Sequence, residues 1–446
     1  MDSKEKKRFL MEQESVTKAV LKLGLPTMIG MMTSALYNLV DTYFVGSLGT
    51  SQTAAVSIAF PLGIILLAIG LLFGAGASSY LARLLGSKRF KEADTCFSTA
   101  LASAIATGGI IIFFMLVFMR PLLYALGATE TVMPYAIEYA VPFLLGLMFN
   151  VFNISVNNMI SAEGATNVSM IAMLIGGCIN MFLDPLLIFG FHMGITGAAV
   201  ATLISRIISF LIFVHYLLSK KSNFHLSLKN VHPSTALYKE IFKIGIPMLF
   251  FQFLCSLAMG ITNFQAKAYG DYAVAGIGVA NRVLSLGSMM VTGFLKGYQS
   301  FVGFNYGAGN FNRSKIATKK TLLWSTMFCI TAGVILILFH TGIMHLFTKT
   351  DEKMIELGGT VLILNAITFM GTGYMMVNNF QFMALGRAKE GGIISISRQG
   401  LFFFPLIFLL PLFFGLKGLL LAQPAADVLT MIMILFMTYK KDFYED

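Results

Sequence analysis

Apolar stretches long enough to cross a bilayer follow one another along almost the whole chain. About 20 apolar residues in a helix span the roughly 30 Å hydrocarbon core of a membrane. Only 12% of the residues are charged, against about 25% in a typical soluble domain. We therefore predict an all-α polytopic membrane protein. Its twelve expected transmembrane helices lie near 17–46, 53–82, 94–119, 131–160, 168–189, 194–219, 238–267, 273–302, 316–346, 354–384, 393–414 and 416–438.

Basic residues indicate how these stretches are oriented. They are concentrated before the first stretch, after the second, between the sixth and seventh, and after the last. Cytoplasmic connections are the ones that carry excess lysine and arginine, so both termini are expected in the cytoplasm. The net charge of +11 therefore indicates membrane orientation rather than nucleic-acid binding. The other side has few basic residues: Arg120, Lys267, Lys349, Lys353 and Lys417.

The two halves of the chain repeat each other. Leu21-Lys-Leu-Gly-Leu-Pro26 corresponds to Phe242-Lys-Ile-Gly-Ile-Pro247, and the same register aligns Gly76 with Gly297 and Gly86 with Gly307. Duplicated six-helix halves are typical of transporters that hold a substrate between two lobes near the bilayer midplane. We expect two pseudo-symmetric lobes around a central cavity. The expected segments are a cytoplasmic tail at 1–15, a first lobe at 16–219, a cytoplasmic linker at 220–237, a second lobe at 238–439 and a cytoplasmic tail at 440–446.

Two carboxylates lie inside apolar stretches, where a charge is costly and usually functional. Asn180 and Asp184 are four residues apart and share one helix face. Pro185 has no N–H, so it leaves the carbonyl of Met181 without its helical partner. Asp41 is a second intramembrane carboxylate that could meet this oxygen-rich region. The alternative is that each aspartate only hydrogen-bonds a neighbouring helix.

Several motifs carry a family resemblance over about Val16 to Tyr439. With its twelve stretches, the sequence resembles the multidrug and toxic compound extrusion (MATE) transporters, and within them the DinF-like and MepA-like bacterial branch. The matching motifs are Leu39-Val-Asp-Thr42, Arg83-Leu-Leu-Gly86, Asn180-x-x-x-Asp-Pro185, Gly197-Ala-Ala-Val-Ala-Thr-Leu-Ile-Ser-Arg206 and Asn305-Tyr-Gly307.

The resemblance implies a cation site in the first lobe, formed by Asp41, Asn180, Asp184 and Thr202, with Asn157 nearby. Such oxygen ligands suit Na⁺, and two neighbouring carboxylates equally suit a proton. No cofactor other than this coupling ion is expected. Another branch of the family carries acidic residues in the second lobe. Here the corresponding stretches read Phe250-Phe-Gln252 and Asn378-Asn379, so we expect coupling in the first lobe and a packing role for Asp427 as an interhelical partner.

Candidate residues for the substrate cavity are less clearly marked. The chain has 28 methionines and 41 phenylalanines, and methionine side chains repack around varied shapes. Lys296 is a cation within the eighth stretch; it either pairs with asparagine or backbone oxygens or faces the cavity. The candidates are Tyr37, Phe149, Phe152, Met173, Met181, Gln252 and Lys296.

We expect a monomeric secondary antiporter of the bacterial cytoplasmic membrane, not an enzyme, that exports amphipathic, mostly cationic compounds in exchange for H⁺ or Na⁺. One alternative is a flippase for lipid-linked oligosaccharides from the same superfamily, although such proteins commonly have more helices and a basic cavity. Another is an intramembrane aspartyl protease, whose Tyr-Asp and Gly-x-Gly-Asp motifs are replaced here by Val-Asp-Thr and Leu-Asp-Pro. No ATP-binding loop is present, and four isolated cysteines favour neither a disulfide framework nor a metal site.

Overall fold

The computed structural model describes residues 3–219, 221–348 and 351–438, and within them the chain is helical, with no β-strand. The expected boundaries at 220 and 439 and the expected tail at 440–446 lie outside the described residues. The α-helices are α1 (Ser3–Glu12), α2 (Val16–Gly46), α3 (Thr50–Gly86), α4 (Phe90–Val117), α5 (Met119–Ala125), α6 (Met133–Ala162), α7 (Thr166–Pro185), α8 (Gly194–Leu218), α9 (Thr235–Lys267), α10 (Asp271–Gly307), α11 (Phe311–His345), α12 (Glu352–Ala384), α13 (Ala388–Ile396) and α14 (Phe403–Thr438). Two π-helical turns, η1 (Leu186–Gly190) and η3 (Ser397–Leu401), and one 3₁₀ turn, η2 (Leu228–Asn230), complete the fold.

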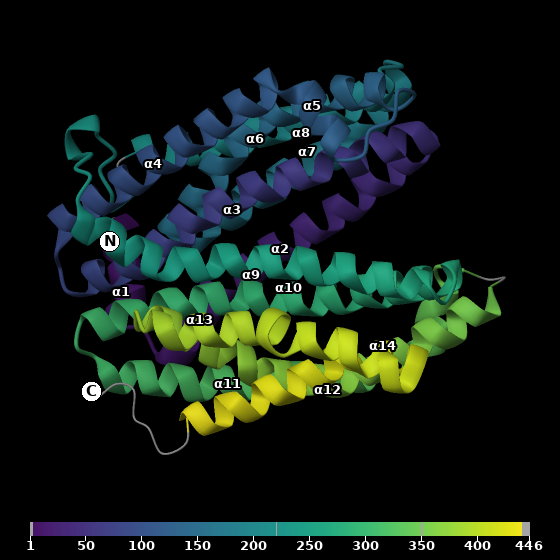
Figure 1. Cartoon of the computed structure of the whole chain (residues 1–446). Coiled ribbons are helices and arrows are strands. Elements are labelled where there is room, and N and C mark those ends of the chain that lie inside the picture. The colour runs from purple at the N-terminus through teal and green to yellow at the C-terminus, as the bar shows by residue number, and fades with distance from the viewer. Residues whose placement is uncertain (1–2, 220, 349–350, 439–446) are drawn as a thin grey trace.

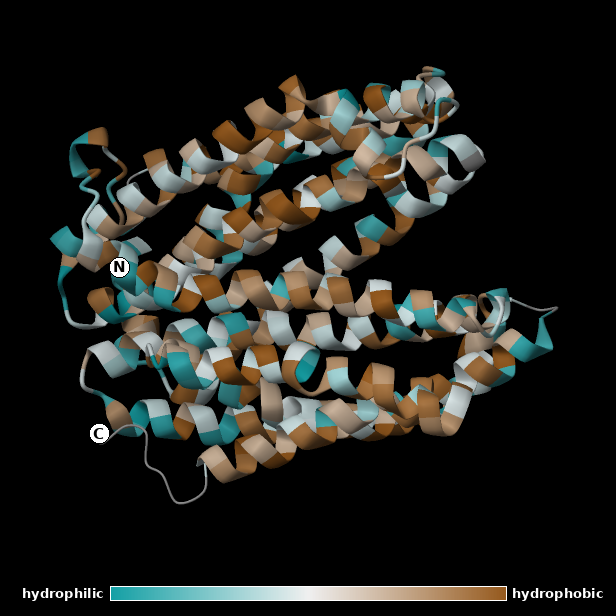
Figure 2. Ribbon diagram, viewed as in Figure 1, coloured by the Kyte–Doolittle hydropathy of each residue, from teal (hydrophilic) through white to brown (hydrophobic). Residues whose placement is uncertain are grey.

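The expected all-α membrane architecture is confirmed. Eleven helical segments of the described chain are long and apolar enough to cross a membrane, and the last of them covers 51 residues, Ala388–Thr438. That segment reverses at Gly415, whose φ of 55° and ψ of −133° are not helical, so it crosses twice and gives twelve crossings. Figure 2 shows hydrophobic residues along most of each helix, with hydrophilic residues mainly near the connections at both ends.

Two helical lobes lie side by side, α2–α8 in one and α9–α14 in the other (Figure 1). We call them the N lobe and the C lobe. Within the N lobe α6 packs against α3 and α8, and α7 packs against α2; within the C lobe α12 packs against α10 and α11. The lobes come together at the end of the molecule that carries α1, here called the α1 end, and diverge towards the opposite end.

Glycines of the internal repeat make the closest contacts between the lobes. A Cβ atom on Gly245 of α9 would lie 2.1 Å from the carbonyl oxygen of Leu72 in α3. A Cβ atom on Gly86 of α3 would lie 2.0 Å from the carbonyl oxygen of Phe304 in α10, and one on the repeat-related Gly307 would lie 2.2 Å from that of Arg83. Only glycine permits such backbone approach. All these contacts lie near the α1 end, which the small residues thus hold closed.

Side-chain bonds add to this closure. Ser79 of α3 donates a hydrogen bond to the carbonyl of Met383 in α12. Arg83 of α3 pairs with Glu240 of α9, with 3.2 Å between Nη2 and Oε2. Both bonds join the N lobe to the C lobe.

Helix α1 was not expected, because the segment 1–15 was predicted as a polar tail. Its Lys7 Nζ lies 3.1 Å from Oε2 of Glu163, in the turn between α6 and α7, while the backbone carbonyl of Glu14, just beyond α1, accepts a 2.7 Å hydrogen bond from Arg313 of α11. The segment therefore bridges the two lobes. Its buried Met11, 1% exposed, supplies the apolar contact that stabilises the helix.

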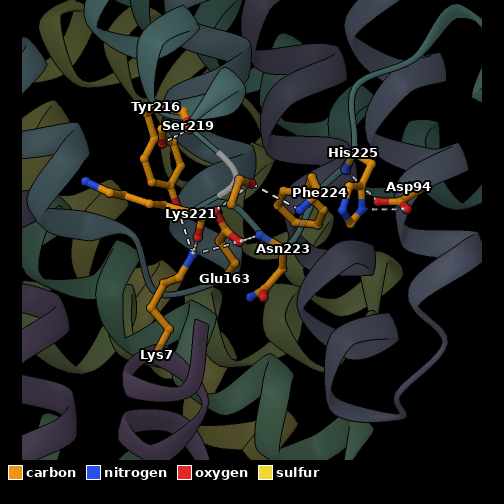
Figure 3. Close-up of polar contacts among 10 residues, drawn as sticks. Lys7, Asp94, Glu163, Tyr216, Ser219, Lys221, Asn223, Phe224 and His225 are labelled. Carbon is orange, nitrogen blue, oxygen red and sulfur yellow. Dashed lines mark hydrogen bonds and ion pairs between the residues drawn. The ribbon is translucent and has the colours of Figure 1, made fainter. Parts of the chain in front are cut away.

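Figure 3 shows how Glu163 organises the neighbouring connection. The carboxylate accepts hydrogen bonds from the Tyr216 hydroxyl at 2.5 Å, the Ser222 hydroxyl at 2.9 Å and the Asn223 backbone N–H at 2.5 Å. Its side chain is fully buried, and these hydrogen bonds offset the cost of removing the carboxylate from water. The start of the 221–234 connection is thereby fixed to the N lobe.

We predict that Gly245→Val separates the lobes at the α1 end, because the added side chain would collide with the Leu72 backbone. A cysteine at Ser79, which is 2% exposed, is the reporter in a background without the native cysteines. It should be protected from a water-soluble maleimide in the parent protein and should react readily in the Gly245→Val variant.

The matched control is Gly260→Val on the same helix, because a Cβ atom there has nothing within 4 Å. It should leave the reporter protected. Equal protection in Gly245→Val and in the parent would show that this glycine contact does not hold the end closed.

Candidate functional site

Helix α7 carries the central residues of the predicted site. Asn180 and Asp184 lie on one face near the end of the helix, and α7 stops at Pro185. The chain then winds into the π-helical turn η1, so the irregularity expected at the proline takes the form of a change from α- to π-helix. Single π-helical turns frequently occur at functional sites.

Three of the predicted ligands meet in the N lobe. The Nδ2 atom of Asn180 lies 3.4 Å from Oδ1 of Asp184 and 3.4 Å from Oγ1 of Thr202 on α8. Asp184 is 0% and Asn180 2% exposed. Yet Oδ2 of Asp184 and Oδ1 of Asn180 have no hydrogen-bond partner within the described chain. Buried oxygens of native proteins are normally paired, so these two are acceptors available to a proton or a small cation.

Asp41 approaches this group from α2. Its side chain is half-buried and lies close enough to Asp184 and to Arg206 for electrostatic interaction with both. Helix α2 comes close to α7 because Gly177 has no side chain: a Cβ atom there would lie 2.8 Å from Cγ2 of Thr33. The packing of α2 on α7 thus brings the two intramembrane carboxylates of the N lobe to one interior region.

Arg206 is a member of this region that the sequence analysis missed as a site residue. It lies one helical turn after Thr202 on α8, with its guanidinium 5.1 Å from the ring centroid of Phe143. Its Nη1 atom is buried without a hydrogen-bond partner in the part of the chain that the structure describes, and it interacts electrostatically with Tyr37 and Asp41. The four-residue spacing from Thr202 was the available signal, since residues i and i+4 share a helix face.

The C lobe holds a related pair of charges in the opposite order. Arg398, in the π-helical turn η3, contacts Asp427 of α14 through Nε to Oδ1 at 2.8 Å and Nη2 to Oδ2 at 3.3 Å. Gln423 donates a further hydrogen bond of 2.8 Å to Asp427, and Thr368 of α12 one of 3.4 Å. Asp427 is thus the interhelical partner that the sequence analysis expected. Its charge is neutralised, whereas Asp184 of the N lobe has no basic partner among the described residues.

Asn157 forms no side-chain hydrogen bond with this group within the described chain. Its Nδ2 atom lies 3.8 Å from the sulfur of Met173, and Met173 precedes Asn180 by seven residues, or about 10 Å along the helix axis. The Oδ1 atom of Asn157 is buried and has no partner in the described ranges. The expected place of Asn157 near the Asn180–Asp184–Thr202 group therefore stays a prediction.

The candidate cavity residues have different surroundings. Phe149 and Phe152 both pack edge-on against Phe210 of α8, with ring centroids 5.2 and 4.6 Å away, which is interior packing of the N lobe. Tyr37 lies beside Gly177 of α7, and Met173 lies against Gly30 of α2. Met181, Gln252 and Lys296 are half-buried.

No group of three or more His, Cys, Asp and Glu side chains that could hold a metal ion occurs among residues 3–219, 221–348 and 351–438. The N-lobe group offers carboxylate, amide and hydroxyl oxygens instead. Such a donor set suits a hard monovalent cation or a proton.

Comparisons with known proteins agree with the fold. The family described as MatE matches residues 26–186 and 247–409, one segment in each lobe. The multidrug export protein MepA of Staphylococcus haemolyticus is 31% identical over 449 residues, covering 98% of this chain and 96% of its own. MepA of Staphylococcus aureus is 30% identical over 448 residues with the same coverage. A solved structure described as the outward-facing conformation of a multidrug resistance MATE family transporter matches with a TM-score of 0.89 and 29% identity, covering 96% of each chain.

Replacing Asp427 and replacing Asp184 should affect the stability of the protein differently. Removing one partner of a buried ion pair typically costs about 3–5 kcal/mol, so Asp427→Asn should lower the melting temperature of the purified protein by several degrees. Asp184→Asn removes a charge that has no basic partner and should not lower it. Thermal melts of both variants in one detergent provide the comparison. A melt of Asp427→Asn like that of the parent, or an equal loss in both variants, would contradict this assignment.

Proposed function

Because this chain belongs to the MatE family of multidrug exporters, we propose that it is a secondary antiporter that exports amphipathic, mostly cationic compounds in exchange for H⁺ or Na⁺. It is a multi-pass membrane transporter, not an enzyme. The observation that carries the proposed coupling is the N-lobe group, where buried Asp184 and Asn180 each present an oxygen without a partner. A buried carboxylate in this state gains most from binding a cation or a proton.

The lobes give the proposed exchange its two sides. In this structure they meet at the α1 end and diverge at the opposite end, so the half-buried Asp41 is the carboxylate more accessible from the open side. A cation entering there neutralises Asp41 and Asp184 and releases the bound compound. Cation binding can shift the equilibrium between two arrangements of the lobes only when the affinity for the cation differs between these arrangements. We infer that the incomplete site at Asp184 provides this difference in affinity.

We place the α1 end in the cytoplasm of a bacterial cell and the protein, as a monomer, in its cytoplasmic membrane. Basic residues support this orientation, since Lys88, Arg89 and Lys91 follow α3 at the α1 end, and Arg313 and Lys315 begin α11 there. Excess lysine and arginine mark cytoplasmic connections. The structure then corresponds to a state open to the outside.

The coupling role predicts separate effects on binding and on transport. Asp41→Asn and Asp184→Asn keep side-chain shape but remove the charge, so each variant should still bind a fluorescent cationic drug while losing gradient-driven uptake. The measurement is drug uptake into inverted proteoliposomes with H⁺ and Na⁺ gradients imposed separately. Asp271→Asn is the control, because Asp271 is an exposed carboxylate at the start of α10. Uptake by Asp184→Asn at the parental rate would exclude Asp184 from coupling.

Orientation can be tested with two single cysteines in a cysteine-free background. Leu228 of the 221–234 connection is 90% exposed, and Leu346 at the end of α11 is 83% exposed. In intact cells an impermeant maleimide should label Leu346→Cys directly and Leu228→Cys only after permeabilisation. The reverse pattern would invert the orientation, and labelling of both positions in intact cells would contradict the twelve-crossing topology.

A further inference from the structure

Lys296 is a cation at membrane depth in α10 that the proposed coupling does not use. Its Nζ atom forms no hydrogen bond or ion pair within the described parts of the chain, and the side chain is half-buried. Thr292, one turn earlier, donates its hydroxyl to the Ser288 carbonyl at 2.8 Å. An ammonium inside a membrane protein is costly unless it is paired or faces a wet cavity. Because the side chain is not sealed completely by protein, the direction in which it points decides what it meets.

Neighbouring glycines fix the direction in which Lys296 points. Cβ atoms on Gly293 and Gly297 would lie 2.7 Å from Met28 and 2.4 Å from Leu23, so this edge of α10 contacts α2. A Cβ atom on Gly303 would lie 3.1 Å from Ala82 of α3. Successive helical residues point about 100° apart, which places Lys296 about 60° from Gly293 and about 20° from Gly303, between these two edges. The side chain thus faces the N lobe, between α2 and α3.

The same face of α10 continues towards the open end. Arg282, Ser285, Met289, Thr292 and Lys296 follow one another at spacings of three and four residues, and all are at least partly exposed. Val291 and Leu295, on other faces, are 3% and 0% exposed. Since the lobes diverge in this direction (Figure 1), the stripe lies on the part of α10 where the N lobe moves away from it. Its only charges are the two cations, Arg282 and Lys296.

The acidic groups at membrane depth in the surrounding helices are engaged elsewhere. Asp41 on α2 interacts with Arg206 and with Asp184 inside the N lobe. Asp427 on α14 is bound by Arg398, and Glu240 on α9 pairs with Arg83 and with Lys243. No carboxylate of the described chain therefore neutralises Lys296.

We propose that Lys296 binds an anionic group of the transported compound, so that the substrates include zwitterionic amphiphiles. The carboxylate of such a compound contacts Lys296 on the C lobe. The cationic aromatic part of the compound lies towards the carboxylates of the N lobe, Asp41 and Asp184. A hydrogen bond between ammonium and carboxylate is charge-assisted and gains strength in a weakly polar site. This inference rests on the proposed export function and specifies its substrate class.

Two rhodamine dyes that differ by one charge provide the test. Rhodamine 6G is an ethyl ester with a positive charge, and its free acid is a zwitterion with the same aromatic core. Binding of each dye to purified protein is measured by fluorescence polarisation, and uptake is measured in proteoliposomes. Lys296→Gln should weaken binding of the free acid by about tenfold, the usual scale for a lost charged hydrogen bond, and should leave ester binding unchanged or improved.

Two further variants separate charge from packing. Lys296→Arg keeps the cation and should keep the parental preference between the dyes. Lys417→Gln removes an exposed cation of the C lobe outside the stripe and should behave like the parent.

The outcomes distinguish the two levels of the proposal. If the parent exports the ester but Lys296→Gln leaves the ratio of the two affinities unchanged, the Lys296 assignment fails and the export function stands. If the parent binds and exports neither dye, the export function fails and the Lys296 assignment fails with it. If Lys296→Gln does not give a monodisperse protein, the affinities of the parent protein for the two dyes provide the test instead. A parent that binds the ester tenfold more tightly than the free acid would overturn the proposal.

Discussion

A charge within the hydrocarbon region must be paired, hydrated or bound by a ligand, and the two lobes meet this constraint differently. In the C lobe Arg398 and Asp427 satisfy each other, with Gln423 as a third member. In the N lobe the acid lies on α7 and the arginine on α8, and one oxygen of Asp184 and one nitrogen of Arg206 have no hydrogen-bond partner in the described chain. The shared helical frame therefore holds one completed ion pair and one incomplete site. That difference is the physical basis for locating ion coupling in the N lobe.

The contact between the lobes depends on a second constraint, the absence of side chains at repeat-related positions. Gly86, Gly307 and Gly245 each let the backbone of the other lobe approach, and Gly24, the repeat partner of Gly245, makes room for the ring of Phe294. Because close contacts occur at matched positions of the two halves, the lobes can meet tightly along one end. The α1 segment adds a polar bridge through Lys7 and Glu163 on one lobe and Arg313 on the other. Both features have to be released before that end can open.

The sequence predicted the features that depend on period and repetition. Apolar length predicted the twelve crossings, and the register between the halves predicted the two lobes. That the repeat-related glycines form the contact between the lobes is seen only in the structure. The four-residue spacing placed Asn180 and Asp184 together, and the family resemblance added Thr202. Features that depend on how the helices pack against one another could not be predicted in this way. Arg206 was missed because it reaches Asp41 only through the packing of α2 and α8 around the same interior. A single sequence does not specify the rotation of each helix about its axis, so the expected roles of Asn157 and Phe152 stay predictions.

We propose that occupancy of the N-lobe carboxylates controls closure of the α1 end. Spin labels at Ser87, just after α3, and Asn310, just before α11, both exposed, report the separation of the lobes there by pulsed electron resonance. We predict that in the parent this separation changes with pH or with Na⁺, whichever ion is coupled. The change should persist in Asp271→Asn and be lost in Asp184→Asn. An Asp184→Asn protein whose separation still follows the same ion with the same midpoint would contradict the claim.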